Sequence, residues 1–244
     1  MSGDMVKCSI CGRREAFYYQ QASGHRLCGR CLERFLYKRI KKTMSQSNVF
    51  KPKPRILYII PCGFILESIA LLDILYKIEK RYSGSITLYT PDHVLDYIAS
   101  RGYGLEAITY SCCKEVDDVV RHIVELIGDT ASRVREYDLA LLPLTRNHLL
   151  GIQIILTAID PGKLWITKLV FRYNGALYTY PAYHIGLHDI VAYAYKRGLL
   201  REPVRDSIVS DKLFTNTLEF TLLLWRKTCE LLYSSIRGFE YITG

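Results

Sequence analysis

Residues 55–75 read RILYIIPCGFILESIALLDIL and contain the pattern that decides the fold. Ile56 to Ile60 form a short apolar run, which is typical of a parallel strand buried on both faces. A turn at Pro61-Cys62-Gly63 follows, and from Ile65 to Lys80 the apolar residues recur at helical spacing. A strand, a turn and a helix therefore form the first unit of an α/β domain.

The same alternation continues along the chain as far as residue 159. Further strands are predicted at residues 85–89, 106–110 and 139–142, and helices at residues 92–101, 115–127 and 149–159. This spacing predicts a doubly wound, mostly parallel sheet. Such sheets hold ligands at the carboxyl ends of their strands, which here are followed by residues 61–64 and 143–148.

Four cysteines precede this domain in two pairs. Cys8 and Cys11 form one Cys-x2-Cys pair, Cys28 and Cys31 form the other, and sixteen residues separate them. Each pair can turn two thiolates to one side of a tight knuckle, so that two pairs close a tetrahedral site. The spacing predicts a structural zinc ion, because four thiolates leave no open coordination position for catalysis. Between the pairs, residues 16–20 are predicted to form a strand and Ser23-Gly24 a hairpin turn.

A basic amphipathic helix is predicted directly after Cys31, with apolar residues at helical spacing along one side. Its cations are Arg34, Lys38, Arg39, Lys41 and Lys42. Residues 1–55 hold 13 Lys/Arg and 3 Asp/Glu, whereas residues 56–244 hold 20 and 21, so the net charge of +9 arises from the N-terminal arm. A basic module on a neutral body indicates contact with a phosphate backbone, and we predict that these cations bind RNA. The alternative is a solvated basic helix that binds nothing specific.

Composition and length favour a main domain with a small appendage. The chain has 244 residues and is 49% hydrophobic and 23% charged, which suits a sizeable core. The predicted divisions are a zinc ribbon with its basic helix at 1–42, a linker at 43–54, the α/β domain at 55–205 and a C-terminal helical segment at 206–244. We expect no membrane contact and a cytoplasmic location, because the chain lacks an apolar signal core at its start and an uncharged run of about 18 apolar residues.

The order of a four-cysteine ribbon, a basic helix, a linker and a strand–loop–helix unit resembles the tRNA 2-thiolation enzymes of the PP-loop ATP pyrophosphatase superfamily. The resemblance runs from about Cys8 to about Ser210. It implies a Rossmann-like (HUP) sheet, an ATP site at the loop after the first strand, and tRNA as the partner. The helix that follows this loop, from Ser68 to Leu75, is close to the family's sequence.

The residues that serve ATP and sulfur in that family are changed here. The loop after the first strand lacks the family's lysine and aspartate, and Glu67 would face phosphate with the wrong sign. The aspartate pair expected after the fourth strand is replaced by Leu149 and Leu150, which removes the usual protein ligands of magnesium. The sulfur-carrying Cys-x2-Cys is represented by the adjacent Cys112 and Cys113. These departures predict a scaffold that has lost its grip on ATP.

Three functions follow as hypotheses. The first is a non-catalytic, zinc-containing tRNA- or RNA-binding paralogue of the thiolation enzymes, acting with an active PP-loop paralogue, as a homodimer, or in another RNA assembly. The second is a divergent ATP-dependent tRNA sulfurtransferase, in which a cation such as Arg146 binds phosphate. The third is a nucleotide-binding regulatory protein. The roles of Cys62, Cys112 and Cys113, which include redox or metal chemistry, stay open.

Overall fold

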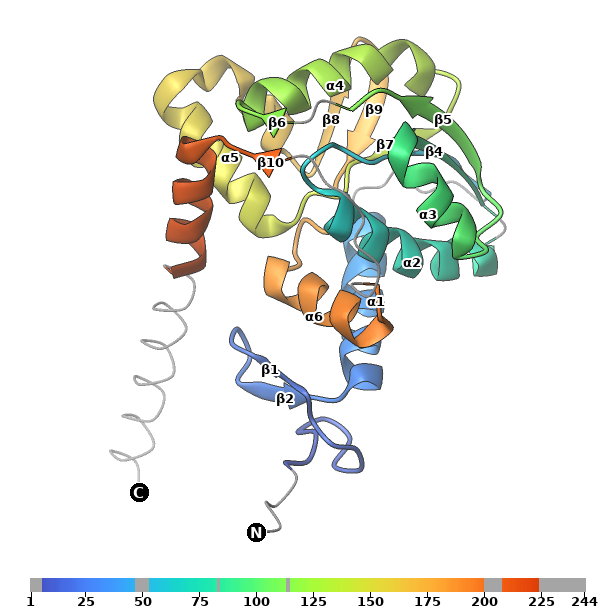
Figure 1. Ribbon diagram of the computed structural model, residues 1–244, viewed down its shortest axis with the longest axis vertical. Coiled ribbons are helices and arrows are strands. Elements are labelled where there is room, and N and C mark those ends of the chain that lie inside the picture. The colour runs from blue at the N-terminus through green and yellow to red at the C-terminus, as the bar shows by residue number, and fades with distance from the viewer. Residues whose placement is uncertain (1–5, 47–52, 83, 113–114, 200–207, 224–244) are drawn as a thin grey trace.

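A six-stranded sheet forms the centre of the protein, whose computed structural model describes residues 6–46, 53–82, 84–112, 115–199 and 208–223 (Figure 1). In sheet order the strands are β5 (Glu106–Tyr110), β4 (Ser85–Pro91), β3 (Arg55–Ile59), β7 (Leu139–Leu141), β9 (Ala176–Thr179) and β8 (Val170–Tyr173). Neighbouring strands are parallel except for β8 and β9 at one edge. The predicted doubly wound, mostly parallel sheet is confirmed.

Helices cover both faces of this sheet (Figure 1). One face carries α1 (Gly29–Gln46), α2 (Ile65–Tyr82), α3 (Leu95–Ser100) and α6 (Leu187–Arg197), and the other carries α4 (Val119–Val134) and α5 (Arg146–Ile159). Short 3-10 turns, η1 (Asp92–Val94) and η2 (Pro161–Thr167), precede α3 and follow α5. Strand β3 is buried on both sides, with Ile56 and Tyr58 in one core and Leu57 and Ile59 in the other.

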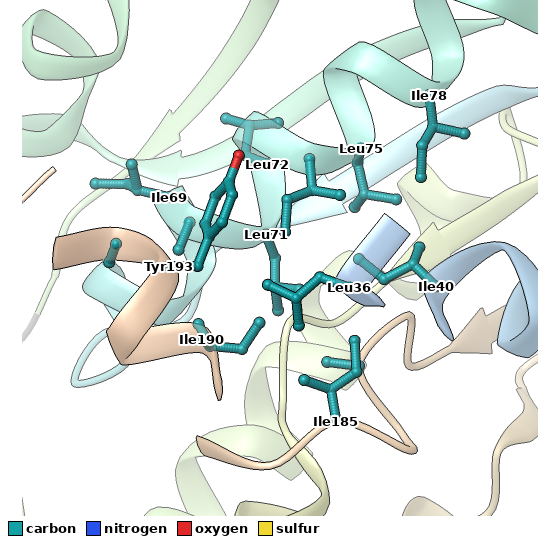
Figure 2. Packing of buried hydrophobic residues seen from close by; sticks show 14 of the residues in the cluster. Leu36, Ile40, Ile69, Leu71, Leu72, Leu75, Ile78, Ile185, Ile190 and Tyr193 are labelled. Atoms are coloured by element: carbon teal, nitrogen blue, oxygen red, sulfur yellow. The ribbon is translucent and has the colours of Figure 1, made fainter. Parts of the chain in front are cut away.

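Helix α1 belongs to the main core. Its residues Leu36 and Ile40 have no exposed surface, and they pack with Leu71 and Leu75 of α2 and with Ile190 of α6 (Figure 2). One continuous apolar cluster therefore joins the N-terminal ribbon helix to the sheet. The basic helix has a fixed position, and only its outer side can meet a partner.

Helix α1 also extends into the segment predicted as a linker at 43–54. It ends at Gln46, because Thr43 and Met44 are buried and continue the apolar stripe of the helix. Residues 47–52 lie outside the described part of the chain.

The single helix predicted over residues 115–127 is wrong at its start. The first residues form β6 (Glu115–Val116), which pairs in parallel with β10 (Ile208–Val209). Asp118 has an extended backbone and accepts a hydrogen bond from the N–H of Arg121 at 2.8 Å. This cap begins α4 four residues later than predicted.

The hairpin of β8 and β9 is absent from the predicted elements. Its turn is formed by Asn174 and Gly175, which both have positive φ angles, of 48° and 81°. An Asn-Gly pair between two apolar runs is the signal of such a turn. The hairpin adds the one antiparallel strand to the sheet.

The first and last described elements lie outside the six-stranded sheet. Near the N-terminus, β1 (Tyr18–Gln20) and β2 (His25–Leu27) form the predicted antiparallel hairpin. Near the C-terminus, residues 212–223 are helical, and residues 224–244 of the predicted helical segment lie outside the described residues. Among the described helices, none is both long and apolar enough to cross a membrane.

A buried carboxylate ties three helices of one face together. Asp73 of α2 accepts hydrogen bonds from the hydroxyl of Tyr193 and, at 3.2 Å, from Nε of Arg197, both on α6. Lys77 donates to Asp73 at 3.0 Å and to Glu33 of α1 at 2.9 Å. Burial raises the pKa of Asp73, but these donors outweigh it and hold the pKa below its ordinary value. The charged form of Asp73 therefore helps to fix α6 and α1 on α2.

Glu79 of α2 is a second buried carboxyl group, with 2% of its surface exposed. Neither of its carboxylate oxygens has a hydrogen-bond partner within the described chain. Burial raises the pKa of Glu79 to about 7. The folded protein therefore favours the protonated form of this group, whereas the unfolded chain ionises it at an ordinary pKa of about 4.3.

We predict that Glu79→Gln stabilises the fold at pH 8 by about 1–3 kcal/mol, because the substitution removes a buried charge without a partner. The folded pKa is raised, so the penalty grows as the pH rises from about 4.5 through 7 and is complete above that range. Denaturant unfolding at pH 8 and pH 5 measures the gain, which should shrink at the lower pH. The exposed Glu136 provides the control, since Glu136→Gln should change stability little at either pH. An equal gain at both pH values would contradict this assignment.

Candidate functional site

The four predicted metal ligands come together at the N-terminal end of α1. The sulfur atoms of Cys8, Cys11, Cys28 and Cys31 all lie within 4.8 Å of one another. Cys8, Cys28 and Cys31 are buried and Cys11 is half-buried. The group could hold a metal ion, as the spacing of the two pairs predicts.

Local backbone structure aims these sulfurs at one point. In the first knuckle, the N–H of Gly12 donates to the carbonyl of Cys8 at 2.8 Å, and Gly12 has a φ of 62° that favours glycine. The second knuckle coincides with the start of α1, where the N–H of Leu32 donates to the carbonyl of Cys28 at 3.0 Å. A turn before β1 and the start of α1 thus supply one cysteine pair each.

The electrostatics of the group fit a bound cation. Burial raises the pKa of the Cys8 thiol, but backbone N–H groups of Cys28, Cys11 and Ile10 outweigh it and bring the pKa to about 6. Burial and the neighbouring sulfurs raise the pKa of Cys31 to about 12. Without a cation, the four sulfurs are too close to ionise together. A metal ion removes this conflict, because it binds all four as thiolates.

The ribbon is fixed to the main domain by polar contacts as well as by α1. The hydroxyl of Tyr18 and the side-chain amide of Gln20 both donate to Oδ1 of Asp189 on α6, each at 2.9 Å. Lys196 of α6 lies over the ring of Phe17, with 5.3 Å between Nζ and the ring centroid. Sequence patterns did not single out Asp189, because its partners are about 170 residues away.

The five predicted RNA-binding residues all lie on α1, the helix that the ribbon leads into. Arg34, Lys38, Arg39 and Lys42 are exposed, and Lys41 is half-buried. The guanidinium of Arg39 lies 5.4 Å from the ring centroid of Phe35. Since Arg34, Lys38 and Lys42 recur every four residues, their charges follow one side of the helix.

Positive charge continues from α1 onto the main domain. His184 lies near three cations, and burial together with the charges of Arg39, Arg146 and Lys42 lowers its pKa. Arg146 is the first residue of α5, and it lines a cavity of about 130 Å³ with residues of the β1 hairpin and of α6. The basic surface of α1 therefore reaches the start of α5.

The crevice where a doubly wound sheet binds ligands lies between β3 and β7, since the strand order reverses there. The loop after β3 turns at Gly63, whose φ is 82°. A Cβ atom at this position would stand 2.7 Å from Cγ2 of Val209 in β10, so the C-terminal segment closes over the loop. A side chain at residue 63 would require Val209 or the loop to shift.

Aromatic side chains fill the same crevice. The ring of Phe64 lies 4.9 Å from that of His148 and 6.0 Å from that of Phe214, which belongs to the C-terminal helix at 212–223. Phe214 is 2% exposed, and its ring reaches Gly151 of α5, where a Cβ atom would be 3.5 Å away. Neither Val209 nor Phe214 was expected at this site, because nothing in the sequence places residues 209 and 214 over a loop at residue 63.

His148, which lies beside Phe64, and Glu67, which lies beside His148, supply no positive charge to the crevice. Burial lowers the pKa of His148 to about 3, so this imidazole is neutral. Its Nδ1 accepts a hydrogen bond from the N–H of Thr145 at 3.4 Å, which leaves the proton on Nε2, 4.0 Å from a carboxylate oxygen of Glu67. A neutral imidazole and a carboxylate do not attract a nucleotide phosphate.

The structure brings Cys62 and Cys112 together in a disulfide, with 6.1 Å between their Cα atoms. These residues follow β3 and β5, whereas Cys113 lies outside the described residues. The spacing of the cysteines along the chain did not indicate this pairing, because the two strands that bring them together are 50 residues apart.

Comparison with known proteins finds similar folds among solved structures. No family model matches the chain, and no curated protein matches it. Among solved structures, the fold is similar to that of the U34-tRNA thiolase NcsA from Methanococcus maripaludis, which is described with its [4Fe-4S] cluster. The TM-score is 0.73 at 15% sequence identity, and the match covers 98% of this chain and 88% of that one. At 15% identity the likeness shows the fold alone. The expected resemblance to a PP-loop thiolase is therefore confirmed for the fold.

We predict that Cys28→Ser lowers bound metal from one ion per chain toward zero, because a missing thiolate opens a four-ligand site. Elemental analysis of the purified full chain by plasma mass spectrometry measures the ratio. Cys112→Ser is the matched control, since Cys112 is paired with Cys62, is not one of the four gathered cysteines, and should leave the ratio at one. A full metal load in Cys28→Ser would reject the site.

Proposed function

We propose that the protein is a zinc-containing, non-catalytic RNA-binding relative of the tRNA 2-thiolation enzymes. The observation that carries this proposal is the row of exposed cations on α1, a helix that the core and the four-cysteine group hold in place. A fixed row of cations suits a phosphate backbone. The helix is already ordered before binding, so only the cationic side chains themselves lose conformational freedom when RNA binds. The fold's likeness to a U34-tRNA thiolase supports tRNA as the RNA.

Zinc is the metal that we propose for the four-cysteine group. Two Cys-x2-Cys knuckles with four sulfurs are the usual ligand set of a structural zinc ion. When bound, zinc would hold the turn of Cys8 and Cys11 against the start of α1, and with four protein ligands it would have no open position for a substrate. The metal thus supports the position of the basic helix.

The absence of catalysis is proposed from the crevice between β3 and β7. Val209 and Phe214 occupy the space over the loop at Gly63, and the polar groups there are Glu67 and a neutral His148. Transfer of an adenylyl or phosphoryl group depends on positioned positive charge and metal ions. The alternative, a divergent ATP-dependent tRNA sulfurtransferase, would need this segment to leave the crevice.

A non-catalytic RNA binder would act with other components. We propose an active PP-loop paralogue as its partner, with a second copy of the chain as the alternative. With the paralogue as partner, this protein would contribute binding to RNA, and the paralogue would contribute the reaction. The third candidate, a nucleotide-binding regulatory protein, is disfavoured by the same closed crevice.

We predict that the protein does not cleave ATP to AMP and pyrophosphate. Chromatography of nucleotides after incubation with magnesium, ATP and tRNA should show no AMP above the protein-free background. AMP release that is lost in Arg146→Gln or Cys62→Ser would overturn the proposal and support the sulfurtransferase alternative.

We predict that RNA binding resides mainly on α1. Changing Lys38, Arg39, Lys41 and Lys42 together to Gln should weaken tRNA binding, and each lost phosphate contact should lower the slope of log K against log salt by roughly 0.9 unit. Binding isotherms at several salt concentrations measure both effects, and circular dichroism checks that the fold is intact.

The matched control removes four exposed cations that lie outside α1. This control changes the net charge by the same amount as the α1 variant but leaves α1 intact. Its substitutions are Arg133→Gln, Lys163→Gln, Arg172→Gln and Lys212→Gln. Its affinity and salt slope should stay close to those of the unchanged protein. Equal losses in both variants would show a non-specific charge effect, and no loss in the α1 variant would show that the basic helix is only a solvated surface.

A further inference from the structure

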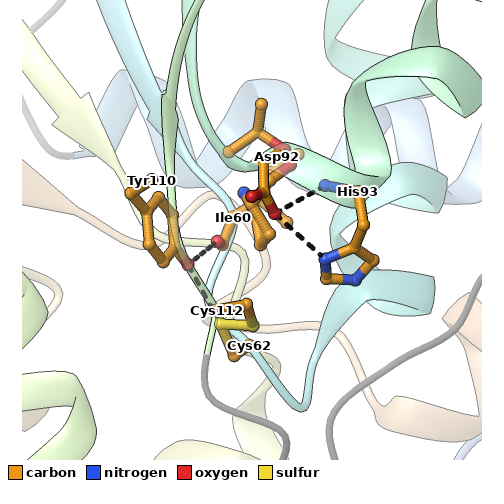
Figure 3. The surroundings of a disulfide bond; sticks show 8 residues. Ile60, Cys62, Asp92, His93, Tyr110 and Cys112 are labelled. Carbon is orange, nitrogen blue, oxygen red and sulfur yellow. Dashed lines mark hydrogen bonds and ion pairs between the residues drawn. A yellow bond between two sulfur atoms is a disulfide. The ribbon is translucent and has the colours of Figure 1, made fainter.

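A pair of cysteines lies at the carboxyl edge of the sheet, apart from the four-cysteine group. Cys62 follows β3 and Cys112 follows β5, and the disulfide between them spans the end of β4 (Figure 3). Strand β4 itself leads into Asp92 and His93, whose carboxylate oxygen and Nδ1 are 3.6 Å apart. Three neighbouring strands thus place sulfur, imidazole and carboxylate groups at one edge.

We propose that Cys62 and Cys112 form a redox-active pair that exchanges electrons with thiols. Four other cysteines of the same chain are free thiols gathered in a group that suits a metal ion. A chain that keeps such thiols reduced works where thiols are abundant, and disulfides in such surroundings are usually transient. The pair is therefore expected to open and close, whereas a permanent structural bridge would suit an oxidising environment.

The two sulfurs differ in access, which assigns their roles. Cys62 has no exposed surface, whereas Cys112 is half-buried and therefore open to attack. An incoming thiolate can reach the sulfur of Cys112, and Cys62 is then the leaving group. In the reverse direction, Cys62 is the resolving thiol that displaces a small thiol from Cys112.

The hydroxyl group of Tyr110 is positioned to accept a hydrogen bond from the reduced Cys62 thiol. It donates to the carbonyl of Ile60 at 2.6 Å, and its oxygen lies 3.5 Å from the sulfur of Cys62 (Figure 3). Since the hydroxyl proton is engaged with Ile60, the oxygen can accept a hydrogen bond from the Cys62 thiol when the disulfide opens. Tyr110 is thus a positioning residue that stabilises the reduced form.

The reaction balances with two molecules of a small thiol such as glutathione. The first thiolate attacks the sulfur of Cys112, which breaks the Cys62–Cys112 bond, forms a mixed disulfide and releases Cys62, which takes up a proton. The second thiolate attacks the sulfur of the small thiol in the mixed disulfide, so that Cys112 leaves and takes up a proton. Overall two electrons and two protons reduce the protein disulfide, and the small thiol is oxidised to its disulfide.

The test is a redox titration of the full, metal-loaded chain in mixtures of reduced and oxidised glutathione. Alkylation after acid quenching, followed by mass spectrometry, counts free thiols, and peptide mapping of the unchanged protein locates the disulfide. The count should rise by two as the buffer becomes more reducing. Cys113→Ser should retain this step, whereas Cys62→Ser and Cys112→Ser should lose it.

Tyr110→Phe separates a redox role from a packing role, because it removes the acceptor for Cys62 while keeping the ring that stacks on Tyr89. At one glutathione ratio, this variant should contain a smaller reduced fraction than the unchanged protein. A disulfide that stays closed, thiols that never pair, or pairing of Cys62 with Cys113 would each overturn the proposal. None of these outcomes affects the proposed RNA binding, which is tested separately with the substitutions on α1.

Discussion

Burial of the loop after β3 beneath the C-terminal segment is the constraint on which the functional account depends. Val209 lies so close to Gly63 that a Cβ atom there would force one of them to shift, and Phe214 packs between the elements that carry Phe64, His148 and Gly151. These contacts lie where a doubly wound sheet would otherwise bind a ligand. Apolar side chains in this crevice contribute to the core, and they exclude the fixed donors that a nucleotide phosphate requires.

Helix α1 is the second feature of the account, because its charged side is exposed. Helix α1 buries one side against α2 and α6, and its other side carries exposed cations. The four-cysteine group holds the start of the helix, and contacts of Tyr18 and Gln20 with Asp189 fix the adjoining hairpin. The cationic surface of α1 and the crevice closed by the C-terminal segment are the two features on which the proposed RNA-binding role without catalysis rests.

Elements that depend on patterns within a few residues could be predicted from the sequence. Contacts between residues far apart in the chain could not. The Cys-x2-Cys pairs, the apolar run of β3 and the helical spacing of α2 are read within a few residues, and the structure has them where predicted. The end of α1 was misplaced because Thr43 is buried although it is polar, and the β8–β9 hairpin was missed although Asn174-Gly175 signals its turn. The cover of Gly63 by Val209 and the pairing of Cys62 with Cys112 depend on residues about 150 and 50 positions apart, for which periodicity carries no information.

The most direct test of the account is a calorimetric titration of the full, metal-loaded chain with ATP, with and without magnesium. A crevice closed by Val209 and Phe214 predicts no heat of binding above that of dilution in either condition. Saturable ATP binding in the micromolar range that requires magnesium would contradict the account, because it would mean that the loop at Gly63 still holds a nucleotide.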